Sequence, residues 1–257
     1  MIVEAVLTPA ELPALSRRDL SQTTCVVIDV LRATSAMLTA LQNGAREIHP
    51  VAEIAQALAI KKRIPDALLA GERHGTRILR DLTGSIDFDL GNSPRDFSAS
   101  AVEGRQIIWT TTNGTRALEA SANAERVLLG AVINLQAAAD LLDLLHPLHL
   151  MLVCAGTRED PAFEDIFAAG ALIDLLKSRD TPLECKDSAQ VAWRTFCQCG
   201  DDRTALIEGS LNARALLQNT GLAPDVPICL ETNSVPLNAQ MDHAGVIRSL
   251  PGTPGKE

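Results

Sequence analysis

The stretch Trp109-Thr110-Thr111-Thr112-Asn113-Gly114-Thr115-Arg116-Ala117 decides the expected fold, because an apolar run changes there into a polar turn and then into a helical pattern. Residues 105–109 are typical of a buried strand, and residues 115–121 are typical of a short helix. A turn between a strand and a helix presents backbone N–H groups and the positive end of the helix dipole to an anion. We therefore interpret the turn as an anion-binding site, with ordinary turn and helix-cap chemistry as the alternative.

The same change from an apolar run to polar residues occurs at three further places along the chain. The run 24–31 is rich in Val and Ile and lacks alternation, which indicates a strand buried on both faces, and its end contains Asp29 to Thr34. Residues 67–70 end in Gly71-Glu72, and residues 148–153 lead into Cys154 to Asp165. Each of these runs is followed by polar residues, which makes the run a candidate for one strand of a common sheet.

Strand-like and helix-like segments alternate over most of the chain. This alternation predicts an α/β fold, a layered sheet with helices on both faces. Predicted strands cover residues 2–7, 24–31, 46–51, 67–70, 105–109, 126–130, 148–153 and 226–230. Predicted helices cover residues 35–43, 52–62, 115–121, 134–145, 164–177, 188–199 and 201–218, and residues 73–100 form a long polar loop. We treat residues 1–257 as a single catalytic unit, within which residues 180–257 form a helical cap or second lobe.

The composition excludes several classes of protein. With 46% hydrophobic residues among 257, the chain can bury a core, so disorder is excluded as its main state. The net charge of −9 argues against a nucleic-acid or anionic-membrane surface, so an anionic substrate needs a focused site. The sequence contains no membrane span and no basic leader, and its six cysteines are scattered in the manner of reduced thiols. We expect a cytoplasmic protein, and whether it forms a homo-oligomer stays open.

The four junctions bring together the residue types that phosphate chemistry requires. In α/β sheets the loops at the carboxyl ends of parallel strands meet at one edge, so we expect one shared site. Carboxylates beside anion donors suit a magnesium-assisted phosphate reaction, because Mg²⁺ takes one or two carboxylates together with substrate oxygens. Each residue also has a plainer interpretation. Asp29 could serve as a turn or helix cap, and Glu164 and Asp165 could complement a helix dipole.

Five motifs in a fixed order resemble one known family. They are Asp29 to Thr34, Gly71-Glu72, Phe88 to Pro94, Thr111 to Ala117, and Cys154-Ala155-Gly156 with Phe163-Glu164-Asp165. Together they resemble the 2-phosphosulfolactate phosphatases of coenzyme M biosynthesis, over about residues 1–240. The resemblance implies a magnesium-dependent acid phosphatase of α/β architecture that hydrolyses the phosphomonoester of a short sulfonated or carboxylated acid. Its substrate would be a small anionic 2-phospho acid.

The residues and the resemblance together give a set of expected roles. Catalysis is assigned to Asp29, Arg32 and Arg116; substrate binding to Thr34, Asn92, Ser93, Thr111, Thr112, Asn113, Gly114 and Thr115; and Mg²⁺ binding to Asp29, Glu72, Glu164 and Asp165. The arginines would neutralise charge on the transferring phosphoryl group. The nucleophile is either a metal-bound water or Asp29. Water is favoured, because the residue two positions after Asp29 is Leu31 and not a second aspartate.

Two other classes of protein remain as alternatives. The chain could bind an anionic metabolite or nucleotide without turning it over, although a pure anion site has little use for carboxylates. A nucleotide-dependent α/β enzyme is the second alternative, but neither Gly-x-Gly-x-x-Gly nor Gly-x4-Gly-Lys-Ser/Thr occurs in the sequence.

Overall fold

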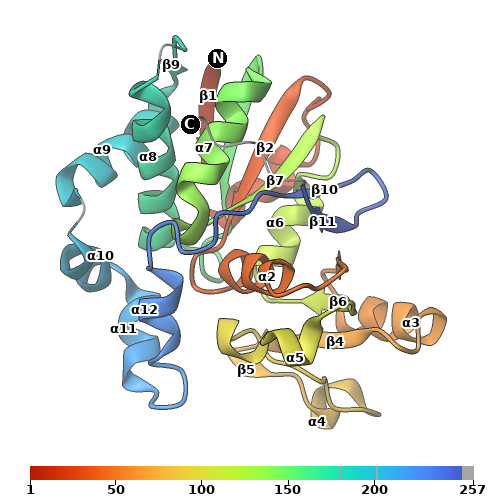
Figure 1. Ribbon diagram of the computed structural model, residues 1–257. Coiled ribbons are helices and arrows are strands. Elements are labelled where there is room, and N and C mark those ends of the chain that lie inside the picture. The colour runs from red at the N-terminus through yellow and green to blue at the C-terminus, as the bar shows by residue number, and fades with distance from the viewer. Residues whose placement is uncertain (180, 201, 251–257) are drawn as a thin grey trace.

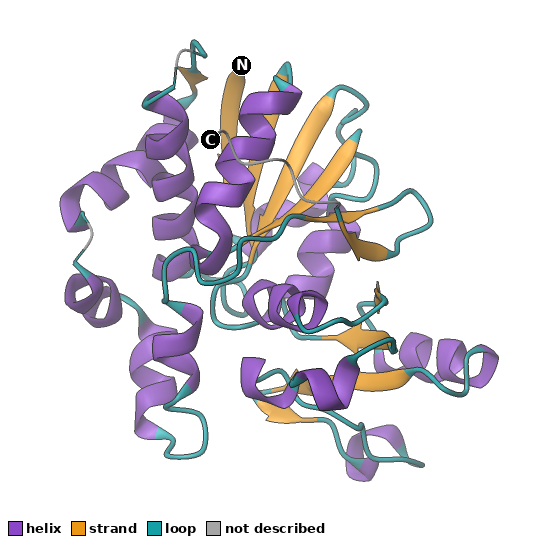
Figure 2. Ribbon diagram, viewed as in Figure 1, coloured by secondary structure: helices purple, strands orange, loops and turns teal. Residues whose placement is uncertain are grey.

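A computed structural model describes residues 1–179, 181–200 and 202–250, and it is an α/β structure built on a large mixed sheet. Helices cover both faces of this sheet, which confirms the predicted fold class (Figures 1 and 2). All six cysteines are free thiols. Within the described residues, no helix has the length and apolar character needed to cross a membrane.

Eleven strands of the described residues form the sheet. Their bounds are β1 Ile2–Val6, β2 Thr23–Ile28, β3 Glu47–Pro50, β4 Leu68–Arg73, β5 Thr76–Arg77, β6 Gln106–Thr110, β7 Arg126–Gly130, β8 His149–Cys154, β9 Glu184–Cys185, β10 Ala239–Met241 and β11 Ile247–Ser249. They lie in the order β5-β4-β6-β3-β11-β10-β7-β2-β8-β1-β9. Each predicted strand before residue 154 is present, with ends that differ by at most three residues.

The sheet consists of two parallel blocks joined by an antiparallel hairpin. Strands β7, β2, β8, β1 and β9 are parallel to one another, and so are β4, β6 and β3. Between the blocks, β10 pairs antiparallel with β7, β11 pairs antiparallel with β10, and β3 pairs antiparallel with β11. Three successive reversals make the two blocks run in opposite directions. The expected single parallel edge is therefore wrong, because β4 and β6 belong to a block whose direction opposes that of β2 and β8.

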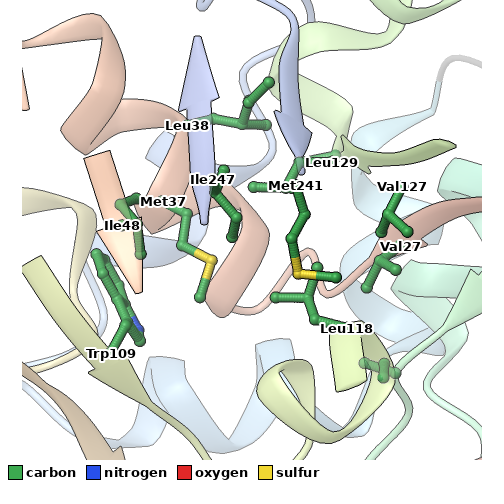
Figure 3. Close-up of a cluster of buried hydrophobic side chains, with 14 of the residues drawn as sticks. Val27, Met37, Leu38, Ile48, Trp109, Leu118, Val127, Leu129, Met241 and Ile247 are labelled. Atoms are coloured by element: carbon green, nitrogen blue, oxygen red, sulfur yellow. The ribbon is translucent and has the colours of Figure 1, made fainter. Parts of the chain in front are cut away.

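The predicted two-sided burial of β2 is confirmed. All six of its residues are buried, and their side chains alternate between two cores. Val27 faces the core beneath α2 (Ala33–Gln42) and α6 (Gly114–Ala120). Val26 faces the core beneath α7 (Leu135–Leu145) and α8 (Phe163–Lys177). The hairpin adds Met241 and Ile247 to the first core, where they lie among residues from both blocks (Figure 3).

The remaining helices are short or lie near the C-terminus. They are α1 Leu12–Leu15, α3 Ile54–Arg63, α4 Arg80–Thr83, α5 Ala99–Val102, α9 Asp187–Cys199, α10 Arg203–Gly209, α11 Leu211–Gln218 and α12 Asp225–Cys229, with single 3-10 turns at Pro9–Glu11, Pro94–Asp96 and Val132–Asn134. The long polar loop predicted at 73–100 contains β5, α4 and the start of α5. The helix predicted at 201–218 is two helices that meet at Ser210, and Asp201 lies outside the described residues.

The C-terminal part contains the main error of the secondary-structure prediction. Residues 226–230 were expected to form a strand, but 225–229 form α12. A short apolar run cannot be assigned to a strand or a buried helix by periodicity alone, and Pro227 is tolerated because it lies in the first turn, where its missing N–H is not required. Strands β10 and β11 were not predicted. Each has only three residues, too few to show a pattern.

Candidate active site

A cavity of about 380 Å³ receives residues from loops of both blocks and from the C-terminal helices. The lining residues are Asp29, Leu31, Arg32, Glu72, His74, Gly75, Asn92, Thr112, Asn113, Gly156, Thr157, Arg158, Asn212, Ala215, Leu216, Asn219 and Leu222. All four strand-end junctions of the sequence therefore contribute to one cavity. Because the blocks run in opposite directions, this convergence comes from the way they meet and not from a common parallel edge. In Figure 1, β1 begins at the N-terminus at the top of the view, and β6 and β4 lie in the lower part.

Asp29 directly follows β2, and its carboxylate is buried at the cavity. Its Oδ1 atom accepts a hydrogen bond of 3.0 Å from the N–H group of Ala33. Burial, together with the nearby carboxylates of Glu72 and Glu164, raises the pKa of Asp29 to about 7. Thr34, expected to bind substrate, is fully buried and outside the lining. Its hydroxyl accepts from the Asp29 N–H group at 3.0 Å and so holds Asp29 in place.

Glu72 connects β4 to the turn that follows β6. Its Oε1 atom accepts a hydrogen bond of 2.8 Å from the N–H group of Thr112, and its Oε2 atom accepts one of 2.7 Å from the N–H group of Gly75. Gly71, the preceding residue, has a φ of +147° and lies so close to the next strand that a Cβ there would be 2.0 Å from the Thr110 carbonyl oxygen. The chain can approach β6 this closely only with glycine, and this brings the Glu72 carboxylate to the cavity.

Glu164 and Asp165, expected as metal ligands, lie in the first turn of α8 and outside the cavity lining. Asp165 accepts hydrogen bonds from the N–H groups of Val30 at 2.8 Å and Gly156 at 2.9 Å, so it braces two of the junctions. Burial raises its pKa well above the ordinary value, as do the charges of Glu164 and Asp29. Glu164 accepts from the Ser210 hydroxyl at 2.7 Å. Among the described residues, no three His, Cys, Asp or Glu side chains lie close enough to hold a metal ion together.

The turn at 110–116 satisfies several of its own hydrogen-bonding groups. The N–H group of Thr115 donates to the Thr111 hydroxyl at 3.2 Å. The Thr115 hydroxyl donates to the Thr111 carbonyl oxygen at 3.0 Å and accepts from the Thr111 N–H group at 3.2 Å. The N–H group of Thr112 donates to Glu72. The N–H groups of Thr112 and Thr115, which were expected to bind an anion, are thus occupied by the protein itself, which corrects that part of the prediction. Thr111 and Thr115 fix the turn, and only Thr112 and Asn113 of this stretch line the cavity.

Asn113 joins this turn to the loop after β8. Its Nδ2 atom donates to the carbonyl oxygens of Ala155 at 3.1 Å and Arg158 at 3.0 Å, and its Oδ1 atom accepts from the N–H group of Arg158 at 3.1 Å. Arg158 has a φ of +59°, a left-handed conformation that non-glycine residues seldom adopt. The three bonds hold the loop in this conformation at the rim of the cavity.

The two arginines that were expected to act on phosphate differ in position. Arg32 lines the cavity and is buried, with its Nη1 atom 2.7 Å from Oδ2 of Asp225. Arg116 lies outside the lining, and its 40%-exposed side chain is 3.3 Å from the carboxylate of Glu159. The structure therefore brings Arg32, and not Arg116, to Asp29 and Glu72.

Residues 7–241 match the family model described as 2-phosphosulpholactate phosphatase. The chain belongs to this family. It is 35% identical over 238 residues to a probable 2-phosphosulfolactate phosphatase of Caldanaerobacter subterraneus subsp. tengcongensis, covering 92% of this chain and 94% of the relative.

Two further relatives carry the same name. The protein of Clostridium acetobutylicum is 33% identical over 225 residues, covering 87% of this chain and 92% of the relative. That of Deinococcus radiodurans is 36% identical over 233 residues, covering 88% and 93%. The similarity extends over nearly the full length of each relative. The family match over residues 7–241 includes the junctions from both blocks and the C-terminal helices that line the cavity.

Within this family fold, two buried acceptors at the cavity have no hydrogen-bond partner among the described residues. They are Oδ1 of Asn92 and Oγ1 of Thr112. Buried polar atoms are nearly always paired, so two unpaired oxygens at one cavity indicate a place where a ligand or ion binds. Ser93, the neighbour of Asn92, lies outside the lining, and its hydroxyl donates to Asp225 at 2.6 Å. Of Asn92 and Ser93, both expected to bind substrate, only Asn92 therefore lines the cavity.

Sequence reasoning missed several residues around the cavity. Asp225 is fully buried and accepts from two arginines, but it stood at the edge of a segment expected to be a strand. Asn212 donates to Glu164 at 2.6 Å and lines the cavity from α11. Neither residue lies in a local motif of strand, turn and helix, so their positions depend on contacts with distant parts of the chain.

Proposed function

We propose that the protein is a magnesium-dependent phosphatase that hydrolyses the phosphomonoester of a small anionic 2-phospho acid, with 2-phosphosulfolactate as the first candidate. The products are sulfolactate and inorganic phosphate. The observation that carries the proposal is the family match over residues 7–241, whose motifs place Asp29, Glu72 and Arg32 around one cavity. A phosphoric monoester hydrolase follows from the names of the family and of its relatives.

The size and charge of the cavity support a small anionic substrate. A volume of about 380 Å³ is at the lower end of the range for small-molecule pockets. Arg32 and Arg158 contribute cationic groups to the lining, and their guanidinium N–H groups would donate to the oxygens of an anionic substrate. Leu31, Leu216 and Leu222 supply apolar lining, which suits the short carbon chain of such an acid.

The donor set fits Mg²⁺. Asp29 and Glu72 present hard carboxylate oxygens to the cavity, beside the unpaired oxygens of Asn92 and Thr112. Space beside Oδ2 of Asp29 is kept open by Gly114, where a Cβ would be 2.6 Å from that oxygen. Mg²⁺ is commonly held by one or two carboxylates together with waters and substrate oxygens, so Asp29 and Glu72 would be sufficient as its carboxylate ligands. When bound, it supplies a Lewis acid that polarises the phosphoryl group.

The residues of the chain itself account for the other requirements of phosphoryl transfer. The buried guanidinium of Arg32 would stabilise charge that develops on the transferring phosphoryl oxygens, which is the main catalytic requirement of this reaction. The Asn92 and Thr112 side chains would orient the substrate. Leu31, two residues after Asp29, departs from the aspartyl-phosphate motif, so we propose water as the nucleophile, with Asp29 as the alternative.

A phosphate-release assay tests the proposal. The protein is incubated with 2-phosphosulfolactate, with 2-phospholactate and with an aryl phosphate, each in the presence of Mg²⁺ or of a chelator. We expect release that depends on Mg²⁺ and is fastest with the two phospho-acids. Binding of these acids without release under any condition would favour a metabolite-binding protein. Release that persists in chelator would reject Mg²⁺ as the cofactor while leaving the phosphatase in place.

A further inference from the structure

Asp225 is fully buried at the centre of a cluster of charged and polar groups next to the cavity. Its Oδ2 atom accepts a hydrogen bond of 2.7 Å from Nη1 of Arg32. Its Oδ1 atom accepts one of 2.6 Å from the Ser93 hydroxyl and one of 2.8 Å from Nε of Arg95. The side chain of Asp225 is 0% exposed and that of Arg32 4% exposed, whereas that of Arg95 is 40% exposed. A buried guanidinium needs a charged partner, and for Arg32 the partner is Asp225.

Arg32 has a second anchor on the opposite block. Its Nη2 atom donates to the Gly75 carbonyl oxygen at 2.8 Å, and the N–H group of Gly75 donates to Glu72 at 2.7 Å. A guanidinium has five N–H donors in a rigid plane, so fixing one on Asp225 and one on Gly75 sets the direction of the other three. Arg32 lines the cavity, and those remaining donors are the ones available to a ligand.

We propose that Asp225 is a positioning residue, which holds the guanidinium of Arg32 in the orientation that binds a phosphoryl group. It acts from α12, 193 residues after Arg32, and it does not itself line the cavity. The proposal rests on the proposed function. Without Asp225, the long Arg32 side chain keeps only its bond to Gly75 and can rotate away, and small displacements of a positioned group lower rates strongly.

A structural role is the competing explanation, because Asp225 also ties α12 to Ser93 and Arg95. Arg95→Gln is the matched control: it removes one charged partner of Asp225 and leaves the contact with Arg32 intact. Arg95 lies outside the cavity lining. Asp225→Asn and Asp225→Ser are the test variants, so the comparison does not depend on one of them folding. Thermal unfolding of every variant separates loss of fold from loss of positioning.

The readouts are kcat/KM for phosphate release and the dissociation constant of inorganic phosphate, measured by calorimetry in Mg²⁺ buffer. We expect Asp225→Asn to lower kcat/KM by about thirtyfold and Arg32→Ala by about a hundredfold. Arg95→Gln should change it by less than about threefold. In the Arg32→Ala background, Asp225→Asn should lower kcat/KM by less than a further threefold or so, because the group that it positions is already absent. Free guanidinium ion should partly restore activity to Arg32→Ala, but not to the double variant.

If the wild type releases phosphate, three results overturn the proposal. One is an Asp225→Asn loss that is as large in the Arg32→Ala background as in the wild type. The second is an equal loss in Arg95→Gln, and the third is an Arg32→Ala variant with unchanged phosphate affinity and kcat/KM. If the wild type releases no phosphate, the proposed function fails separately. The phosphate affinities then still decide whether Asp225 acts through Arg32, and a wild type that does not bind phosphate also overturns the inference.

Discussion

Gly114 lies against the carboxylate of Asp29, so that a Cβ atom on Gly114 would be 2.6 Å from Oδ2 of Asp29 and 2.6 Å from Cβ of Ala33. The two residues come from opposite blocks of the sheet, at the start of α6 and the end of β2. The contact joins the turn at residues 110–116 to Asp29, a cavity-lining carboxylate whose pKa is raised by burial.

Gly114→Ala should therefore displace Asp29 and lower kcat/KM for phosphate release by about a hundredfold, the order of loss that a shift of 1 Å can produce. Gly221→Ala is the control, since a Cβ there would meet only Asn219 Oδ1, at 3.4 Å. Steady-state kinetics of both variants check the prediction. A Gly114→Ala protein with wild-type kinetics would show that the space beside Asp29 has no role in turnover.

The burial of Asp29 predicts a pH dependence of stability in metal-free protein. The pKa of Asp29 is about 7 in the folded state and has its ordinary value near 3.8 in the unfolded state. Between these values the folded state binds more protons, so the free energy of unfolding should be highest on the acid side and fall as the pH rises toward about 7. The raised pKa of Asp165 acts in the same direction.

Thermal unfolding in chelator between about pH 5 and pH 8 measures this effect. Asp29→Asn should reduce the slope, because the amide does not titrate, while the exposed Asp81→Asn should leave it unchanged. Added Mg²⁺ should raise the melting temperature most at the upper end of this range, where Asp29 is ionised. If Asp29→Asn does not change the pH dependence of stability, a group other than Asp29 is responsible for it.

Asn113→Ala should loosen the connection between the two blocks at the cavity. The substitution removes three hydrogen bonds and leaves the buried Ala155 carbonyl without its side-chain donor, so we expect a loss of about 2 kcal/mol in the free energy of unfolding. KM for the phospho-acid should rise, because the loop carrying Arg158 is no longer fixed. Urea unfolding and kinetics test this, with the exposed Asn123→Ala as the control.

Arg116→Ala should change kcat/KM by less than about threefold, whereas Arg32→Ala should lower it by about a hundredfold. The reason is their position: Arg32 is buried in the cavity lining, and Arg116 pairs with Glu159 at the surface. An exposed ion pair contributes little to stability, so the melting temperature of Arg116→Ala should also be close to that of the wild type. Equal losses of activity in the two variants would return Arg116 to the catalytic set.

The sequence determined the α/β class, most of the helices and strands, and the junctions that contain the site. These follow from local patterns: an apolar run without alternation for β2, and polar residues directly after β2, β4, β6 and β8. Such patterns depend on neighbours within a few residues, so they can be recognised along the chain.

Tertiary structure alone decided the direction of the two blocks and the insertion of the β10–β11 hairpin between them. It also decided which of the predicted site residues line the cavity and which only hold the surrounding loops in place. Asp29 and Glu72 line the cavity, whereas Glu164 and Asp165 brace the loops around it. Whether a carboxylate faces a ligand or a backbone N–H group depends on which distant segment lies beside it. Asp225 and Arg32 show the same dependence: a contact across 193 residues has no local pattern, because folding creates it.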